Sequence, residues 1–164
     1  MSRTIKHIVE LSVVENVEAL SKTDRELMMR AKKVSETAYA PYSQFYVGAA
    51  IRLSSNEIIE GSNQENMAYP SGMCAERVAI YYANSFHTDV RIDTIAITAH
   101  AKEFKVDHPI APCGACRQSM AEYELKQKHP IRLIMTGESG EVYIAESVEM
   151  ILPFMFNEIE LKKK

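Results

Sequence analysis

Residues 92–123 read IDTIAITAHAKEFKVDHPIAPCGACRQSMAEY, and this stretch decides the fold class. Its first part, residues 92–99, is strongly apolar and rich in β-forming side chains, which predicts a central strand. Two prolines interrupt the chain after it, and a helix is predicted over 113–123. A central strand followed by a helix of this length is typical of a layered α/β fold.

Elements on both sides of this stretch complete a mixed sheet with helices packed on it. A helix is predicted to begin at a capping box formed by Thr23 and Glu26 and to end at Pro41. The link between residues 131–135 and 142–145 is too short for a parallel crossover, so these last two strands are predicted to be antiparallel. The other predicted elements are strands over 45–53 and 57–59, a helix over 74–83 and a short helix over 148–151. Together they predict a three-layer α/β/α sandwich with a mixed sheet of five strands.

Length and composition indicate one globular domain. The chain has 164 residues, of which 46% are apolar and 25% charged, and its net charge is −3. We expect residues 23–164 to form the domain and residues 1–22 to be an N-terminal extension, with a possible extra strand over 5–14. The charge argues against a nucleic-acid partner, and no apolar run approaches the ~20 residues that span a membrane. Residues 1–10 lack an apolar signal core, so a cytoplasmic location is expected.

The three cysteines predict a metal site. Cys113 and Cys116 form a C-x-x-C pair, and Cys74 lies upstream in a C-x-E motif. A catalytic zinc keeps three protein ligands and one open position, which three thiolates would provide. Both predicted helices begin at a cysteine, so their N-termini would direct partial positive charge at the metal.

Two charged residues follow the first predicted ligand. Glu76 is placed to move protons between a water and a substrate nitrogen, and Arg77 is placed to donate to a thiolate. A C-x-E motif followed by P-C-x-x-C is the pattern of zinc deaminases. A C-x-x-C pair alone is more typical of a redox pair or a structural zinc half-site, for which His100 or His108 would be the nearest fourth ligand.

These motifs resemble the cytidine deaminase family, specifically its small, homotetrameric, three-cysteine zinc type. The resemblance covers roughly residues 24–158, and its motifs lie at 40–50, 63–69, 74–77, 112–118 and 152–156. It implies one zinc ion per chain, bound by Cys74, Cys113 and Cys116, with Glu76 as the proton shuttle.

The resemblance also implies the substrate-binding residues. Asn63 and Glu65 would hold the ribose hydroxyls, and Phe45 would pack against the pyrimidine. The backbone of Ala75 would meet the base carbonyl, and Phe156 of a neighbouring subunit would cover the site. Taken alone, the two polar residues are also typical of loops, and the two aromatic residues are also typical of a core.

The implied reaction is hydrolytic deamination of cytidine and 2′-deoxycytidine in pyrimidine salvage. Cysteine as the first ligand and the tight link before residue 142 favour a free nucleoside over a polynucleotide. One alternative is a deaminase of a modified cytosine nucleoside, such as a blasticidin-type antibiotic. The other is a non-catalytic scaffold stabilised by zinc, which would have no need of Glu76.

Overall fold

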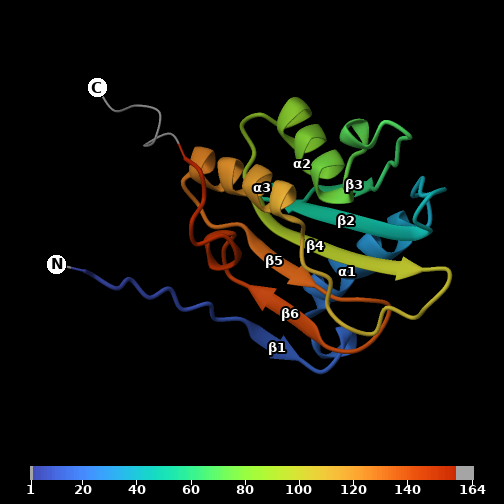
Figure 1. Ribbon diagram of the computed structural model, residues 1–164, viewed down its shortest axis with the longest axis horizontal. Helices are drawn as coiled ribbons and strands as arrows, with labels where there is room; N and C mark the ends of the chain where they lie inside the picture. The colour runs from blue at the N-terminus through green and yellow to red at the C-terminus, as the bar shows by residue number, and fades with distance from the viewer. Residues whose placement is uncertain (1, 158–164) are drawn as a thin grey trace.

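A computed structural model describes residues 2–157 as a mixed six-stranded sheet covered by helices (Figure 1). The strand order is β1-β6-β5-β4-β2-β3, and β4 and β5 are the parallel pair. The strands are β1 Ser12–Val14, β2 Phe45–Leu53, β3 Ile58–Ser62, β4 Ile92–Ala101, β5 Arg132–Met135 and β6 Val142–Ala145. The helices are α1 Lys22–Ser35, α2 Ala75–Phe86 and α3 Gly114–Gln127, with short 3-10 turns at Val17–Ala19, Tyr69–Ser71 and Glu149–Ile151.

Helices cover both faces of the sheet, because alternate side chains of each strand point to opposite sides. On β4, Ile95 and Ile97 pack with α2 and α3, whereas Ala96 packs with α1. The alternation gives two buried clusters, one on each face. The expected layered α/β arrangement is therefore observed, and β5 and β6 are antiparallel as predicted.

The prediction of five strands is wrong, since β1 adds a sixth at the edge. β1 pairs antiparallel with β6, in a register that runs from Ser12 opposite Ile144 to Val14 opposite Val142. Of the extra strand expected over 5–14, only the last three residues, 12–14, form hydrogen-bonded pairs with a neighbouring strand. The partner strand lies far away in the sequence, so local periodicity carries little information about this pairing.

Helix α1 begins and ends earlier than the sequence predicts. Ser21, rather than Thr23, is the N-cap, and its hydroxyl oxygen accepts from the N–H of Asp24 at 3.1 Å. The helix ends at Ser35, well before Pro41. Hydroxyl groups satisfy the last carbonyls there, since Thr37 Oγ1 donates to Val34 O at 2.8 Å.

Gly48 of β2 marks a close approach of two backbones. A Cβ atom at this position would lie 2.0 Å from the carbonyl oxygen of Ala31 in α1. The glycine therefore lets the helix lie directly on the strand, as its position in a strand pattern predicts. No helix among residues 2–157 combines the length and the apolar character needed to cross a membrane.

Candidate active site

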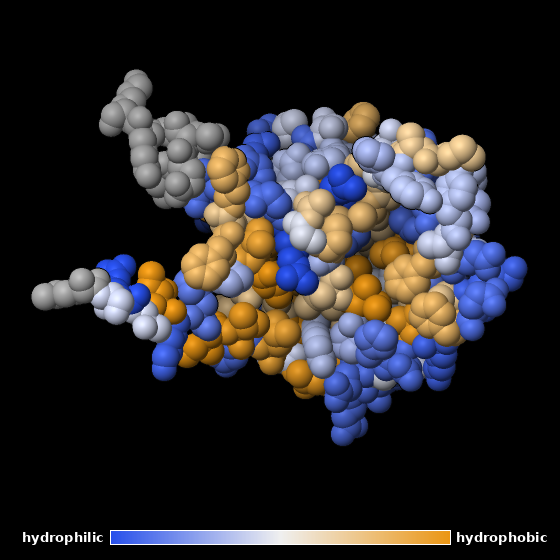
Figure 2. Space-filling model, viewed as in Figure 1, coloured by the Kyte–Doolittle hydropathy of each residue, from blue (hydrophilic) through white to orange (hydrophobic). Residues whose placement is uncertain are grey.

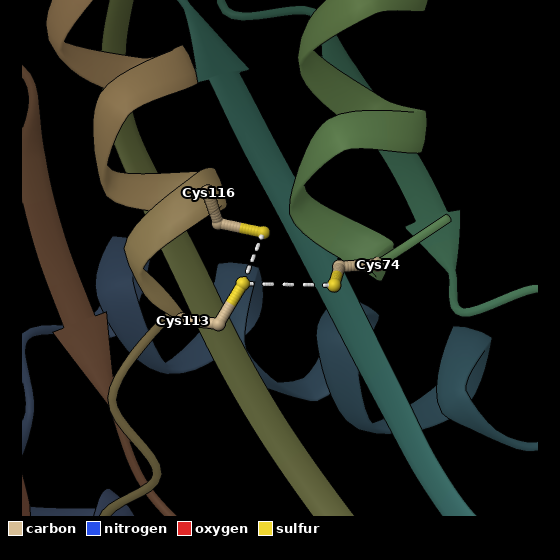
Figure 3. Close-up of side chains that lie close together, drawn as sticks. All are labelled: Cys74, Cys113 and Cys116. Atoms are coloured by element: carbon tan, nitrogen blue, oxygen red, sulfur yellow. Dashed lines mark hydrogen bonds between the residues drawn. The ribbon is translucent and has the colours of Figure 1, made fainter. Parts of the chain in front are cut away.

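The three cysteines lie together at the N-termini of two helices. Cys74 is the N-cap of α2, Cys113 is the N-cap of α3, and Cys116 lies one turn further along α3. Their sulfur atoms all lie within 4.8 Å of one another, with Cys113 Sγ 3.8 Å from Cys74 Sγ and 3.5 Å from Cys116 Sγ (Figure 3). Thiols from two distant segments thus converge on one point.

This donor set fits a zinc ion. Ligand sulfurs at about 2.3 Å from a tetrahedral zinc lie roughly 3.8 Å apart, close to the observed spacing. The side chains of Cys74 and Cys113 make no capping hydrogen bond to their helices, so neither sulfur is engaged in capping. The positive ends of two helix dipoles meet at the cluster, and they favour thiolate over thiol.

Arg77 adds a positive charge beside the cluster. Its Nη2 donates to Cys74 Sγ at 3.9 Å and to Gly72 O at 3.4 Å. The hydrogen bond from Cys116, with the guanidinium of Arg77, lowers the pKa of Cys74 to about 5, although partial burial opposes this. The interaction with Cys74, together with burial, raises the pKa of Cys116. The cluster therefore gives up its first proton readily.

Glu76 follows the N-cap of α2 and is buried next to the cysteines. Its side chain lines the cavity described below, although the residue is only 4% exposed. Burial raises the pKa of the Glu76 carboxyl. A carboxyl group with a raised pKa exchanges protons more easily near neutral pH than an exposed one does.

A cavity of about 780 Å³ opens in front of Glu76 and the cysteines. Seven of the residues predicted for the site line it: Phe45, Asn63, Glu65, Cys74, Glu76, Arg77 and Cys113. The lining does not include Ala75, Cys116 or Phe156. Ala75 and Cys116 are buried behind the wall, at the helix starts.

Asn63 and Glu65 shape the cavity wall by binding their own chain. Asn63 accepts from the N–H of Val47 at 2.7 Å and donates to the carbonyl of Phe45 at 2.9 Å. Glu65 accepts from the N–H of Tyr42 at 2.8 Å. Burial opposes ionisation of Glu65, but hydrogen bonds from this loop lower the pKa of its carboxyl. Each side chain keeps hydrogen-bonding capacity for a ligand.

The two aromatic residues of the predicted site lie in different places. Phe45 lines the cavity and stacks on Phe104, with ring centroids 6.4 Å apart. Phe156 is 58% exposed and lies outside the cavity of its own chain. Five lining residues lie outside the predicted site and its motifs: Gly72, Met73, Ile97, Ile110 and Ala111. All except Ile97 lie close before a cysteine motif, and that position could have indicated them.

The histidines considered as a fourth metal ligand lie elsewhere. His100 stacks on Tyr46, and its Nδ1 lies 3.1 Å from Ser35 Oγ of α1, across the sheet from α2. His108 is exposed and lies beside Asp107. Within residues 2–157, the metal-binding cluster contains the three cysteines and neither histidine.

The fold and the site together define an α/β protein with a three-cysteine cluster that fits zinc, and comparison with known proteins identifies the family. Residues 21–129 match the family model for the cytidine and deoxycytidylate deaminase zinc-binding region. The chain is 37% identical to a cytidine deaminase of Sporosarcina psychrophila, over 83% of this chain and 93% of the relative. It therefore belongs to the cytidine and deoxycytidylate deaminase family.

Two further comparisons bear on the fold and on the substrate. A solved cytidine deaminase from Burkholderia pseudomallei superposes with a TM-score of 0.68 at 36% identity, covering 80% of this chain and 97% of that chain. A blasticidin-S deaminase from Bacillus cereus is 29% identical over 84% of this chain and 94% of the relative. Proteins named for two different substrates are thus similar to this chain over most of its length.

Proposed function

We propose that the chain hydrolyses cytidine and 2′-deoxycytidine to uridine and 2′-deoxyuridine, releasing ammonia. The observation that carries this proposal is the placement of buried Glu76 beside three converging cysteines, at the inner end of a cavity large enough for a nucleoside. The relatives named as cytidine deaminases support it. The role is cytoplasmic pyrimidine salvage.

One zinc ion per chain would be held by Cys74, Cys113 and Cys116. Zinc bound there supplies Lewis acidity, which lowers the pKa of a water molecule. Three thiolates leave the centre with a net negative charge, which by itself weakens this effect. The N-termini of α2 and α3, together with Arg77, offset part of that charge.

Glu76 carries the protons of the reaction. Its carboxylate takes a proton from the attacking water and delivers it to N3 of the pyrimidine, while the water oxygen bonds to C4. Glu76 then passes the second water proton to the amino nitrogen. The bond between C4 and that nitrogen breaks, and ammonia leaves. Because Glu76 is shielded from bulk water, the proton stays within the site.

The cavity wall orients the nucleoside. Phe45 packs against the pyrimidine, and the backbone of Ala75 meets the base carbonyl. The remaining donor of Asn63 and the free lone pairs of Glu65 bind the ribose hydroxyls. The backbone contacts of these two side chains hold them in place before a ligand arrives, which reduces the entropy cost of binding.

We also propose that four copies of the chain form a homotetramer, in which Phe156 of one subunit covers the cavity of another. Apolar side chains gather where the N-terminal and C-terminal segments lie close together (Figure 2). The rings of His7 and Phe154 lie 4.4 Å apart there, tilted by 59°. Such patches mark interfaces. Residues 23–164 would form the catalytic domain and residues 1–22 its extension; residues 1 and 158–164 lie outside the described part.

The similarity to a blasticidin-S deaminase keeps a modified cytosine nucleoside as a second candidate substrate. Asn63 and Glu65 favour the plain nucleoside, because both line the cavity where a ribose would lie. A non-catalytic scaffold is disfavoured, because burying a carboxyl group such as Glu76 costs free energy without benefit to a structural metal site.

An ultraviolet assay on four compounds tests the proposal. We expect the purified chain to convert cytidine and 2′-deoxycytidine, and to leave CMP and blasticidin S at least about tenfold less reactive, since a missing polar partner costs on the order of 1–3 kcal/mol. Turnover of blasticidin S alone would favour the second candidate. If the zinc-loaded protein converts none of the four compounds, the proposal that it deaminates a cytosine nucleoside is contradicted.

Metal analysis tests the cysteine cluster separately from activity. Protein purified without chelator should contain close to one zinc per chain, because three sulfur donors already lie at the required spacing. The Cys113→Ser variant should lose most of this zinc. A zinc content near zero in the wild-type chain would remove the basis of the mechanism.

A further inference from the structure

The carboxamide of Gln118 pairs with both backbone polar groups of Phe156. Gln118 Nε2 donates to Phe156 O at 2.7 Å, and Phe156 N donates to Gln118 Oε1 at 3.1 Å. A side chain that binds the N–H and the C=O of the same residue acts like a short piece of β-ladder. Gln118 therefore fixes both the position and the orientation of that peptide unit.

Helix α3 also holds the chain just upstream of Phe156. Arg117 Nη1 donates to Ile151 O at 3.1 Å. The carboxylate of Glu124 accepts from the N–H of Val148 at 2.8 Å and from Glu149 at 3.2 Å. The C-terminal segment consequently runs alongside α3 (Figure 1), whose first turn carries two of the cysteines. One helix thus connects the metal cluster to Phe156.

The fixed backbone determines the direction in which the side chain of Phe156 leaves the chain. Once N and O of a residue are held, the direction of its Cα–Cβ bond is set as well. The residue is 58% exposed and is absent from the cavity lining of its own chain. A ring held outward before a partner arrives loses less conformational entropy on docking than a free chain end.

We propose that Gln118 is a positioning residue, which fixes the backbone of Phe156 so that its ring is directed at the site of a neighbouring subunit. The inference rests on the proposed function, because it assigns Gln118 a role in the cavity that Phe156 completes. Gln118 itself touches neither substrate nor metal in this scheme. Its effect on substrate binding passes through Phe156.

The chain contains a matched control for this interaction. Gln127, on the same helix, makes the same two-point pairing with Ile92: it accepts from Ile92 N at 3.0 Å and donates to Ile92 O at 2.9 Å. Ile92 lies at the start of β4, in the core. Gln127 Nε2 also donates to His129 O at 2.9 Å. Removing the carboxamide of Gln127 therefore tests loss of an equivalent pairing, plus this one further bond, without disturbing Phe156.

Steady-state kinetics with cytidine test the proposal. Loss of hydrogen bonds of this kind predicts that Gln118→Leu raises KM about three- to tenfold and leaves kcat unchanged. Gln118→Glu should have a similar effect, because a carboxylate has no hydrogen to donate to Phe156 O. Gln127→Leu should lower the melting temperature and leave KM unchanged. In a Phe156→Ala background, Gln118→Leu should raise KM no further.

Two results would overturn the proposal. One is an equal rise in KM in the Phe156→Ala background, and the other is an equal rise caused by Gln127→Leu. Hydrogen exchange at the amide of Phe156 separates this proposal from the assigned activity. Gln118→Leu should speed that exchange even if the wild-type chain fails to deaminate cytidine. A failure to deaminate cytidine would refute the proposed function but not the role of Gln118. Unchanged exchange would refute the role of Gln118 whatever the activity.

Discussion

Replacing Glu76 with glutamine is expected to abolish nearly all turnover while leaving the fold and the zinc content intact. General acid–base catalysis by one residue contributes roughly 10²–10⁴-fold, and Glu76 would serve more than one proton transfer in each cycle. The amide has nearly the same shape as the carboxyl, so the buried position at the start of α2 stays filled. The measurement is kcat for cytidine at saturating substrate, together with zinc content and melting temperature.

A surface glutamate provides the control for this variant. Glu122→Gln removes a carboxyl group from the exposed side of α3, and it should leave kcat unchanged. Activity of Glu76→Gln within tenfold of the wild type would show that another group carries the protons. Loss of zinc from the variant would instead show that Glu76 acts on the metal cluster, which would require a different mechanism.

Activity is expected to return when two inactive variants exchange subunits. Glu76→Gln lacks the proposed proton carrier, and Phe156→Asp lacks the ring that would cover the neighbouring cavity. If Phe156 acts across a subunit boundary, some hybrid sites combine Glu76 from one chain with Phe156 from another.

Stacking of an aromatic ring on a base contributes about 1–3 kcal/mol, so Phe156→Ala should weaken cytidine binding by up to about that amount.

The exchange experiment needs proof that the subunits mix. Differently tagged chains should co-purify after mixing, and activity should rise on the same time scale. Mixing Glu76→Gln with Cys113→Ser provides a control, because both defects lie in the same cavity wall and no hybrid site is repaired. Demonstrated exchange without recovery, or a stable and fully active monomer, would refute the shared site.

Features encoded by neighbouring residues were predicted well from the sequence. The bounds of β2 and β6 agree with the predicted strands, because alternating and apolar side chains mark a strand along its own length. The starts of α2 and α3 lie at the cysteines as expected. The convergence of the cysteine motifs was predictable because zinc chemistry requires three donors in one place.

The errors at α1 and at the sheet edge have two different causes. Ser21 and Thr23 are both good N-caps, and only the backbone geometry selects the hydroxyl that reaches Asp24. β1 contains three residues, and its stability comes from pairing with β6 rather than from its own pattern. Short edge strands of this kind carry a weak local signal.

The sequence by itself determined the cysteines that could hold a metal, the position of Glu76 beside them and the layered α/β class, because each of these follows from residue chemistry at short spacing. The tertiary structure alone decided how the wall of the cavity and the C-terminal segment are held. Asn63, in the cavity wall, binds the backbone of β2. Gln118 binds the backbone of Phe156, across 38 positions of sequence. Such contacts depend on how separate elements pack, and the free energy that selects them arises only once the chain has folded.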